Sequence, residues 1–277
     1  MNYSVIDRIK IFILQHKKIV VFLLCFGMVG ILFSVFKDGY SMREDDFSEI
    51  QKYMMEIREK DKSIYNNLMY TELKEETNGI DVSSFQGDID WEKVKEVNLD
   101  FVIIRCGYRN LSNEEIHEDS KFRYNISEAN RLGIPVGVYF YSTARNERET
   151  LEEATFVLNL IKDYEILYPV VYDFELFDSK RTEGVSVDRV NDNALYFLDY
   201  IALHGYKAMF YSNNSYLERV WKEENYGEYK FWLAQYDGEL IRDYDMLQYS
   251  DKGTVQGITG YVDLDKANFK YEKISKD

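Results

Sequence analysis

The stretch Pro169-Val170-Val171-Tyr172-Asp173-Phe174-Glu175 joins an apolar run to two acids at its end. A proline is tolerated at the start of a strand, where the sheet does not need its missing N–H. Acids that end a buried strand are usually placed for a reason, because an unpaired buried charge is unfavourable. The stretch therefore predicts a buried strand that delivers Asp173 and Glu175 to one edge of a sheet.

Similar strand-like runs recur from Gly79 onward. Six others are Ile80–Val82, Phe101–Arg105, Val136–Tyr141, Ala208–Tyr211, Phe231–Gln235 and Met246–Tyr249. Between them lie two amphipathic stretches at helical spacing, the second preceded by a suitable N-cap, Ser186: Leu151, Ala154, Leu158, Ile161 and Val190, Ala194, Phe197, Ile201. This alternation predicts an α/β fold with a parallel sheet, and its regularity favours a barrel.

The N-terminal part contains an apolar segment. Residues 19–36 carry no charge over 18 positions, and as a helix they would span about 27 Å, close to the hydrocarbon thickness of a bilayer. Basic residues are more frequent before the segment (Arg8, Lys10, Lys17, Lys18) than after it (Lys37, Arg43). No small-x-small cleavage site follows it. We therefore expect a cytoplasmic segment 1–18, an uncleaved single-pass transmembrane helix over 19–36, and an extracytoplasmic remainder.

Residues 37–78 contain no proline and are rich in Glu, Lys and Met. Their apolar residues follow a heptad-like stripe: Phe47, Ile50, Met54, Ile57, Ile64 and Leu68. The stripe predicts a helical stalk or linker, either as a coiled coil that self-associates or as a lone helix packed on its own domain. In both cases it would hold a domain over 79–277 away from the bilayer.

Composition excludes several classes of function. The net charge of −15 disfavours nucleic acid as a partner, because a polyanion would be repelled. The chain has three histidines, and no two of them have the spacing of zinc ligands. Its two cysteines, Cys25 and Cys106, lie in unrelated contexts, so a disulfide is not expected.

Polar and aromatic residues recur at the carboxyl ends of the expected strands. They are Asp81, Tyr108, Tyr139, Tyr141, Asp173, Glu175, Tyr211, Asn213, Gln235, Tyr236, Gln248, Tyr249 and Asp263. In β/α barrels these strand ends form the active site. Acids suit proton transfer, amides bind hydroxyls and rings stack on sugars, so the set favours a carbohydrate site.

Asp173 and Glu175 are the sharpest local feature. Residues two apart on a strand point to the same side, roughly 7 Å apart at Cα. Two carboxyl groups at this distance move each other's pKa values apart. One of them can then stay protonated and donate a proton to a glycosidic oxygen. Two alternatives stay open: solvated acids at a strand end, or a hard-cation site formed with Asp81 and Asp263.

Seven motifs follow one another over about residues 79–269. In order they are Gly79-Ile80-Asp81-Val82-Ser83-Ser84-Phe85-Gln86-Gly87 with Ile89-Asp90-Trp91, Phe101–Arg105 with Gly107-Tyr108, Gly137-Val138-Tyr139 with Tyr141-Ser142, Asp173-Phe174-Glu175, Trp232-Leu233-Ala234-Gln235-Tyr236, Gln248-Tyr249-Ser250, and Gly257-Ile258 leading to Val262-Asp263-Leu264-Asp265. Together they resemble glycoside hydrolase family 25, the Chalaropsis-type lysozymes.

The resemblance implies a flattened, irregular, TIM-like β/α barrel that cleaves the β-1,4 bond between N-acetylmuramic acid and N-acetylglucosamine in peptidoglycan. It implies Glu175 as general acid, Asp173 as the helper of a substrate-assisted, retaining step, and Asp81 and Asp263 as further members of the acidic cluster. No cofactor is implied. One departure from the family pattern is Leu247, where many relatives have Trp. The absence of that large aromatic ring could weaken a sugar subsite.

The sequence thus predicts a membrane-anchored peptidoglycan hydrolase. Its expected glycan-binding residues are Tyr139, Tyr141, Tyr211, Gln235, Tyr236 and Gln248. The alternatives are a non-catalytic glycan-binding or wall-scaffolding module, and a metal-dependent hydrolase that uses the same acids. Intact acids favour the enzyme, since a pure binder has no need of them.

Overall fold

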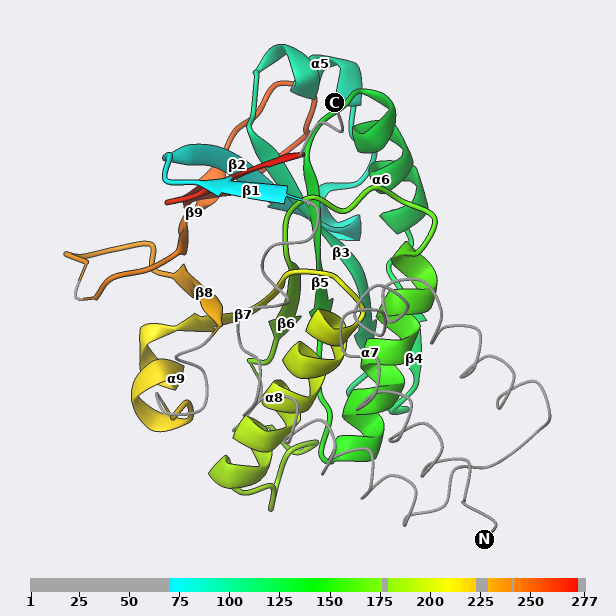
Figure 1. Cartoon of the computed structure of the whole chain (residues 1–277), viewed down its shortest axis with the longest axis vertical. Coiled ribbons are helices and arrows are strands. Elements are labelled where there is room, and N and C mark those ends of the chain that lie inside the picture. Colours follow the sequence, from blue (N-terminus) through cyan, green and yellow to red (C-terminus); the bar gives the residue numbers. More distant parts are fainter. Residues whose placement is uncertain (1–69, 176–178, 223–228, 241, 274–277) are drawn as a thin grey trace, which may run out of the picture. The chain divides into compact units, whose positions relative to one another are not determined.

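The computed structural model of the chain describes residues 70–175, 179–222, 229–240 and 242–273. Its centre is a closed barrel of eight strands (Figure 1). In spatial order these are β2 (Thr77–Val82), β10 (Val262–Ala267), β9 (Met246–Gly253), β8 (Lys230–Ala234), β7 (Ala208–Asn213), β6 (Val170–Asp173), β5 (Val136–Tyr141) and β3 (Phe101–Arg109), and β3 pairs with β2 to complete the ring. The predicted barrel is therefore confirmed.

Strand direction changes at one place. The neighbouring strands in the series β2, β3, β5, β6, β7, β8 and β9 are parallel to one another. Strand β10 is antiparallel to both of its neighbours, β9 and β2. A parallel crossover needs a dozen or more residues, and only residues 254–261 connect β9 to β10. The predicted parallel sheet is confirmed for the seven predicted strands. Strand β10, which was not among the predicted runs, is antiparallel because its connection is too short for a crossover.

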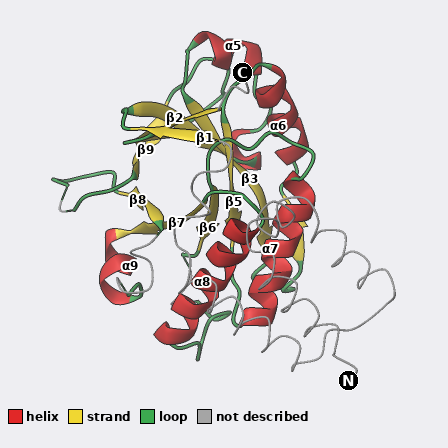
Figure 2. Ribbon diagram, viewed as in Figure 1, coloured by secondary structure: helices red, strands yellow, loops and turns green. Residues whose placement is uncertain are grey.

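Helices cover the barrel unevenly (Figure 2). Helices α6 (Phe122–Arg131), α7 (Glu147–Ile161) and α8 (Val187–Leu203) pack on β3, β5, β6 and β7, and α7 also packs on α8. Two shorter helices, α5 (Trp91–Glu96) and α9 (Asn214–Arg219), and the 3-10 turn η1 (Ser84–Gln86) lie in the connections. Both amphipathic stretches are confirmed as helices, and Ser186 caps α8 by accepting from the Arg189 N–H.

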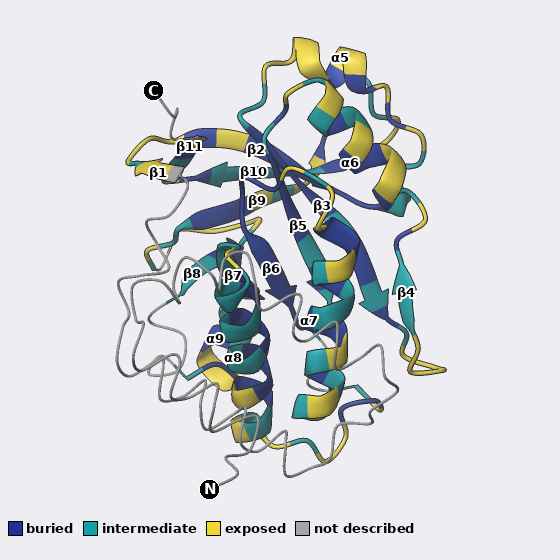
Figure 3. Ribbon diagram, turned by 45° about the vertical axis from the view of Figure 1, so that its right-hand side comes forward, coloured by how far each residue is buried: buried dark blue, intermediate teal, exposed yellow. Residues whose placement is uncertain are grey.

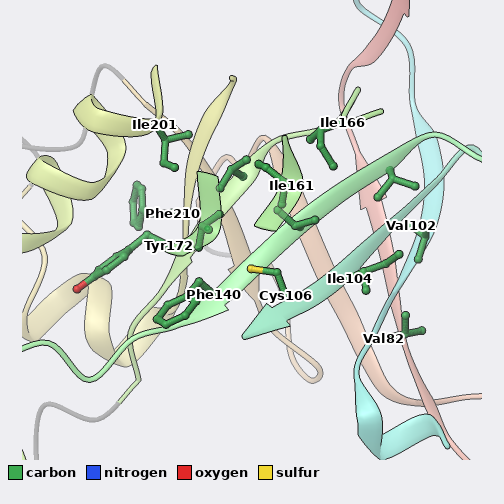
Figure 4. Packing of buried hydrophobic residues seen from close by; sticks show 14 of the residues in the cluster. Val82, Val102, Ile104, Cys106, Phe140, Ile161, Ile166, Tyr172, Ile201 and Phe210 are labelled. Atoms are coloured by element: carbon green, nitrogen blue, oxygen red, sulfur yellow. The ribbon is translucent and has the colours of Figure 1, made fainter. Parts of the chain in front are cut away.

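The barrel strands are largely buried, while the helices expose part of their surface (Figure 3), and the buried side chains form two cores. One set of side chains packs between the barrel wall and the helices, as Val102, Ile104, Phe140 and Tyr172 do in Figure 4. The other set fills the barrel interior and includes Phe101, Ile103, Val171, Met209, Trp232 and Met246. Residues at alternate positions on a strand point to opposite faces, so the interior set shows which strand residues face inward.

Additional strands lie outside the barrel. Strand β4 (Ile116–Glu118) pairs with β3, and β1 (Tyr70–Leu73) pairs with β11 (Lys270–Lys273) in a separate two-stranded sheet. The helical stalk was expected to reach residue 78, and this was wrong for residues 70–78. Tyr70–Leu73 pair with the chain's distant end, and Thr77 is buried with its hydroxyl donated to the Phe269 carbonyl at 2.9 Å, so long-range pairing overrides the helical pattern.

The expected segments 1–18 and 19–36, and residues 37–69 of the stalk, lie outside the described residues. Within residues 70–175, 179–222, 229–240 and 242–273, no helix is both long and apolar enough to cross a membrane.

Candidate active site

The predicted acids meet at one end of the barrel. Asp81 on β2 and Asp173 on β6 occupy inward-facing positions at the carboxyl ends of parallel strands. Tyr141 and Tyr211 flank Asp173 in register on β5 and β7. Asp263 reaches the same end from the amino end of β10, because that strand runs in the opposite direction.

The backbone holds Asp173 and Glu175 on the same side. Asp173 is the last residue of β6, and the intervening Phe174 is buried edge-to-face on Trp221, with ring centroids 6.2 Å apart. The Glu175 carbonyl accepts a hydrogen bond from the Tyr216 hydroxyl of α9 at 2.6 Å. Phe174 and Tyr216 therefore continue the strand alternation one step beyond the sheet and aim Glu175 toward Asp173.

Burial makes this pair retain a proton. The pKa of Asp173 is raised well above its ordinary value, mainly by burial and then by the negative charge of Glu175. Burial also raises the pKa of Glu175, and the hydrogen bond that Asp173 donates to it acts in the opposite direction. Two carboxyls this close titrate as a unit, so the pair keeps a proton to higher pH than two exposed acids would.

Asp81 and Asp263 form a second carboxyl pair. They lie directly opposite each other in the β2–β10 register. Burial and the charge of Asp263 raise the pKa of Asp81 to about 8. Burial, with the charge of Asp251, raises the pKa of Asp263 to about 6. The two pairs together form an acidic cluster that holds more protons than four exposed acids would.

Gln248 organises the aromatic side of the site. Its Nε2 donates to Asp81 Oδ2 at 2.6 Å, and its Oε1 accepts from the hydroxyls of Tyr211 at 2.9 Å and Tyr236 at 2.6 Å. Tyr211 is buried, whereas 45 % of Tyr236 is exposed. Tyr236 can therefore contact a ligand while Gln248 fixes the orientation of its hydroxyl.

Tyr139 lies deeper and lines the interior. Its ring packs edge-to-face on Trp232, with centroids 6.4 Å apart, and its pKa is raised well above the ordinary value by burial and then by Asp81. Tyr141, one alternation further along β5, is the last residue of that strand and so lies nearer the mouth of the barrel. The charges of Asp173 and Glu175 add to burial in raising the Tyr141 pKa. Of the two, Tyr141 is the better placed to meet substrate.

Two expected residues have their polar groups engaged within the protein. Gln235 accepts from Asn214 Nδ2 at 2.7 Å and donates to the carbonyls of Asp237 and Glu239. Asn213 caps α9 by accepting from the Tyr216 N–H. Both residues shape loops at the site's edge.

Leu247, where the chain departs from the family pattern, faces the helices and not the barrel interior. Leu247 is 3 % exposed and belongs to the core between the barrel and its helices, while its neighbour Gln248 faces inward. The expectation that a missing Trp here weakens a sugar subsite was wrong, because this position does not face the site.

Asp265 is a member of the cluster that the sequence reasoning missed. It is fully buried two residues beyond Asp263, accepts from Trp232 Nε1 at 2.9 Å, and has a pKa raised well above the ordinary value by burial and then by Asp81. Its Oδ2 has no protein hydrogen-bond partner within the described residues. Strand alternation after Asp263 was the available signal, since every second residue of β10 shares a face.

Arg105 is the second missed residue, and it brings positive charge to the acids. Its guanidinium donates to Asp119 at 2.7 and 2.8 Å and to Ser84 Oγ at 3.0 Å. It also lies 4.7 Å from the ring centroid of Phe85. Its charge partly offsets the rise in the Asp173 pKa. Tyr108, expected at this strand end, stacks on His117 and also contacts Arg105.

The described acids are not grouped as metal ligands are. Within the described ranges, no three carboxylate, histidine or cysteine side chains are grouped so that they could hold a metal ion. Hard cations bind ionised carboxylates, whereas burial favours the protonated form of these acids. The arrangement suits proton transfer better than cation binding.

Comparisons with known proteins agree with this geometry. Residues 80–258 match the model of the family "Glycosyl hydrolases family 25". The autolytic lysozyme of Clostridium acetobutylicum is 28 % identical over 192 residues, which cover 68 % of this chain and 55 % of that protein. Lysozyme M1 of Streptomyces globisporus is 27 % identical over 206 residues, covering 69 % and 67 %. The chain thus spans about half the length of the first of these relatives.

Solved structures show the same fold. The modular autolysin LytC of Streptococcus pneumoniae matches with a TM-score of 0.61 and 31 % identity, over 69 % of this chain and 46 % of that one. A family 25 glycosyl hydrolase of Bacillus anthracis, at 21 % identity, matches in fold with a TM-score of 0.59 over 73 % and 94 %. The chain belongs to glycosyl hydrolase family 25 and has the fold and clustered acids of a glycosidase.

Proposed function

We propose that the protein is a peptidoglycan hydrolase, a lysozyme that cleaves the β-1,4 bond between N-acetylmuramic acid and N-acetylglucosamine. The observation that carries the proposal is the proton-retaining pair Asp173 and Glu175 at the end of a buried strand. Relatives support the substrate: two are named lysozymes, and LytC has been solved with a synthetic peptidoglycan ligand.

In the free pair the proton lies on Asp173, which donates to Glu175. In the proposed mechanism it moves to Glu175 when the substrate's N-acetyl N–H binds Asp173, because that donor favours the Asp173 carboxylate. As general acid Glu175 protonates the glycosidic oxygen while the substrate's N-acetyl oxygen attacks the anomeric carbon. Asp173 accepts from the N-acetyl N–H and stabilises the positive charge of the cyclic intermediate. Glu175, now a carboxylate, then takes a proton from the water that opens the intermediate, so configuration at the anomeric carbon is retained.

The other residues position the sugar. The charge of Asp81 raises the pKa of Asp173, and the charge of Asp263 raises that of Glu175. Gln248 holds Asp81 in place. The rings of Tyr141 and Tyr236 offer faces for sugar stacking and hydroxyls for hydrogen bonds. Each task uses a side chain at the carboxyl end of the barrel.

We further propose that residues 19–36 anchor the protein in the cytoplasmic membrane, with the hydrolase on the outer side. The supports are the uncharged run and the excess of basic residues before it. An anchored hydrolase would act on nearby wall only, and the stalk could mediate self-association. Protease treatment of intact wall-stripped cells should digest the hydrolase domain; protection of that domain would contradict the orientation.

Incubation of the full-length chain, purified in detergent, with peptidoglycan tests the activity. We expect new reducing ends on N-acetylmuramic acid in a muropeptide analysis, unchanged by a chelator. Binding without cleavage on every wall type would identify a glycan-binding module instead. Activity abolished by chelation and restored by a divalent cation would favour the metal-dependent alternative.

A further inference from the structure

We propose that a hollow formed largely by the connections that follow β5 and β6 binds a carboxylate of the peptide stem that N-acetylmuramic acid carries, an inference that rests on the proposed function. The hollow has a volume of about 400 Å³. The residues that matter among those lining it are Arg145, Asn146, Glu149, Arg181, Ser186 and Arg189.

Two arginines of the hollow are close in sequence to residues of the candidate active site. Arg145 follows Tyr141 by four residues and Arg181 follows Glu175 by six. At no more than about 3.6 Å per residue, these arginines lie within roughly 14 and 22 Å of the two site residues at Cα. A peptide attached to a bound sugar can cover such distances with a few residues.

Two helices begin at the hollow. Asn146 caps α7, which has 15 residues, and Ser186 caps α8, which has 17. The amino ends of helices carry partial positive charge and unpaired N–H groups, which favour anions.

A separate observation concerns Arg181. Its side chain is only 3 % exposed, and its two terminal nitrogens pair with Glu114 and Glu149, each at 2.6 Å. Its Nε is buried and has no acceptor within the described residues. A buried unpaired donor is unfavourable, so this guanidinium favours an acceptor supplied from outside the protein.

The charges around the hollow leave one arginine available. Arg189 pairs with Glu147 at 2.5 Å, whereas Arg145 forms no ion pair with a described residue. Arg145 Nη2 donates to the Glu183 carbonyl at 3.4 Å, and the side chain is exposed. The exposed guanidinium of Arg145 at the hollow can therefore meet an anion. A guanidinium fork matches a carboxylate in a bidentate arrangement.

The proposed substrate supplies such a group. Its glycan backbone is largely uncharged, but the peptide linked to the lactyl group of N-acetylmuramic acid carries carboxylates. The hollow would therefore favour strands that still bear their peptides over bare glycan.

The test compares the full-length wild type with Arg145→Gln on stem-bearing peptidoglycan and on strands freed of peptide by an amidase. We expect kcat/KM to fall roughly tenfold on stem-bearing strands, the effect of losing one charged hydrogen bond. It should stay unchanged on bare strands. Arg145→Lys keeps the charge but not the forked guanidinium. Its kcat/KM on stem-bearing strands should lie between that of the wild type and that of Arg145→Gln.

Arg148→Gln is the matched control, because Arg148 is exposed in the first turn of α7, three residues beyond Arg145, and pairs only locally with Glu152 among described residues. It should behave as the wild type on both substrates. Free stem peptide should inhibit the wild type and not Arg145→Gln.

Equal effects of Arg145→Gln on both substrates, or none, would overturn the stem site while cleavage itself would uphold the proposed function. Inhibition by inorganic phosphate that Arg145→Gln relieves, without inhibition by stem peptide, would assign the hollow to phosphate and also overturn it. Absence of cleavage of either substrate by the wild type would defeat both proposals.

Discussion

Asp263 on β10 lies directly opposite Asp81 on β2, in the antiparallel pair through which β10 joins the barrel. Opposed side chains on neighbouring strands are close, so these carboxyls oppose each other's ionisation. The reversal of β10 creates this arrangement, because it brings the amino end of that strand to the edge where the parallel strands end. The cluster thus depends on one strand that breaks the repeating pattern.

Glu175→Gln should lower kcat on peptidoglycan by about 10²- to 10⁴-fold, the usual contribution of a general acid. The amide keeps the shape of the side chain but cannot donate the same proton. The melting temperature should stay near that of the wild type. Glu96→Gln, at an exposed position on α5, is the control and should change neither quantity. Unchanged turnover in Glu175→Gln would remove Glu175 from its role.

Asp263→Asn should shift the alkaline limb of the pH–activity profile to lower pH. Apart from burial, the negative charge of Asp263 raises the pKa of Glu175. Removing that charge lowers the Glu175 pKa, so the acid loses its proton at a lower pH as pH rises. The measurement is kcat against pH from 4 to 9. A limb that stays in place, or moves upward, would show that Asp263 does not act on Glu175.

Asp81→Asn should stabilise the folded protein at pH 8 but not at pH 4. The pKa of Asp81 is raised from 3.8 to about 8 in the folded state, so between these values the folded state binds more protons than the unfolded state. Stability from this group is therefore complete below about pH 4 and is lost as pH rises toward 8. The neutral amide does not titrate and avoids that loss.

The expected gain at pH 8 is roughly 1–2 kcal/mol, the usual effect of relieving an unfavourable site residue. Thermal unfolding at both pH values measures it. The exposed Asp88→Asn, where the pairing with Lys121 lowers the carboxyl pKa, should show no such gain at high pH. A constant difference between Asp81→Asn and wild type at both pH values would contradict the assignment.

Much of this site was predictable because strand alternation and strand ends can be derived from local sequence. The limits of β5 match the predicted run Val136–Tyr141, and Asp81, Asp173 and Asp263 meet as expected. Strand direction and ring closure depend on pairing between distant residues, which local periodicity does not report. The reversal of β10 therefore had to come from the structure, whereas Asp265 could have been found from its alternation with Asp263.

Leu247→Trp should destabilise the protein by about 1–3 kcal/mol without improving glycan binding. Leu247 on β9 is buried in the core between the barrel wall and its helices, and extra volume in a packed core forces its neighbours apart. The residue that faces the site is Gln248, so the new ring would not reach a sugar. Chemical unfolding and a glycan-strand binding assay measure the two effects. Tighter strand binding with unchanged stability would place position 247 in a sugar subsite after all.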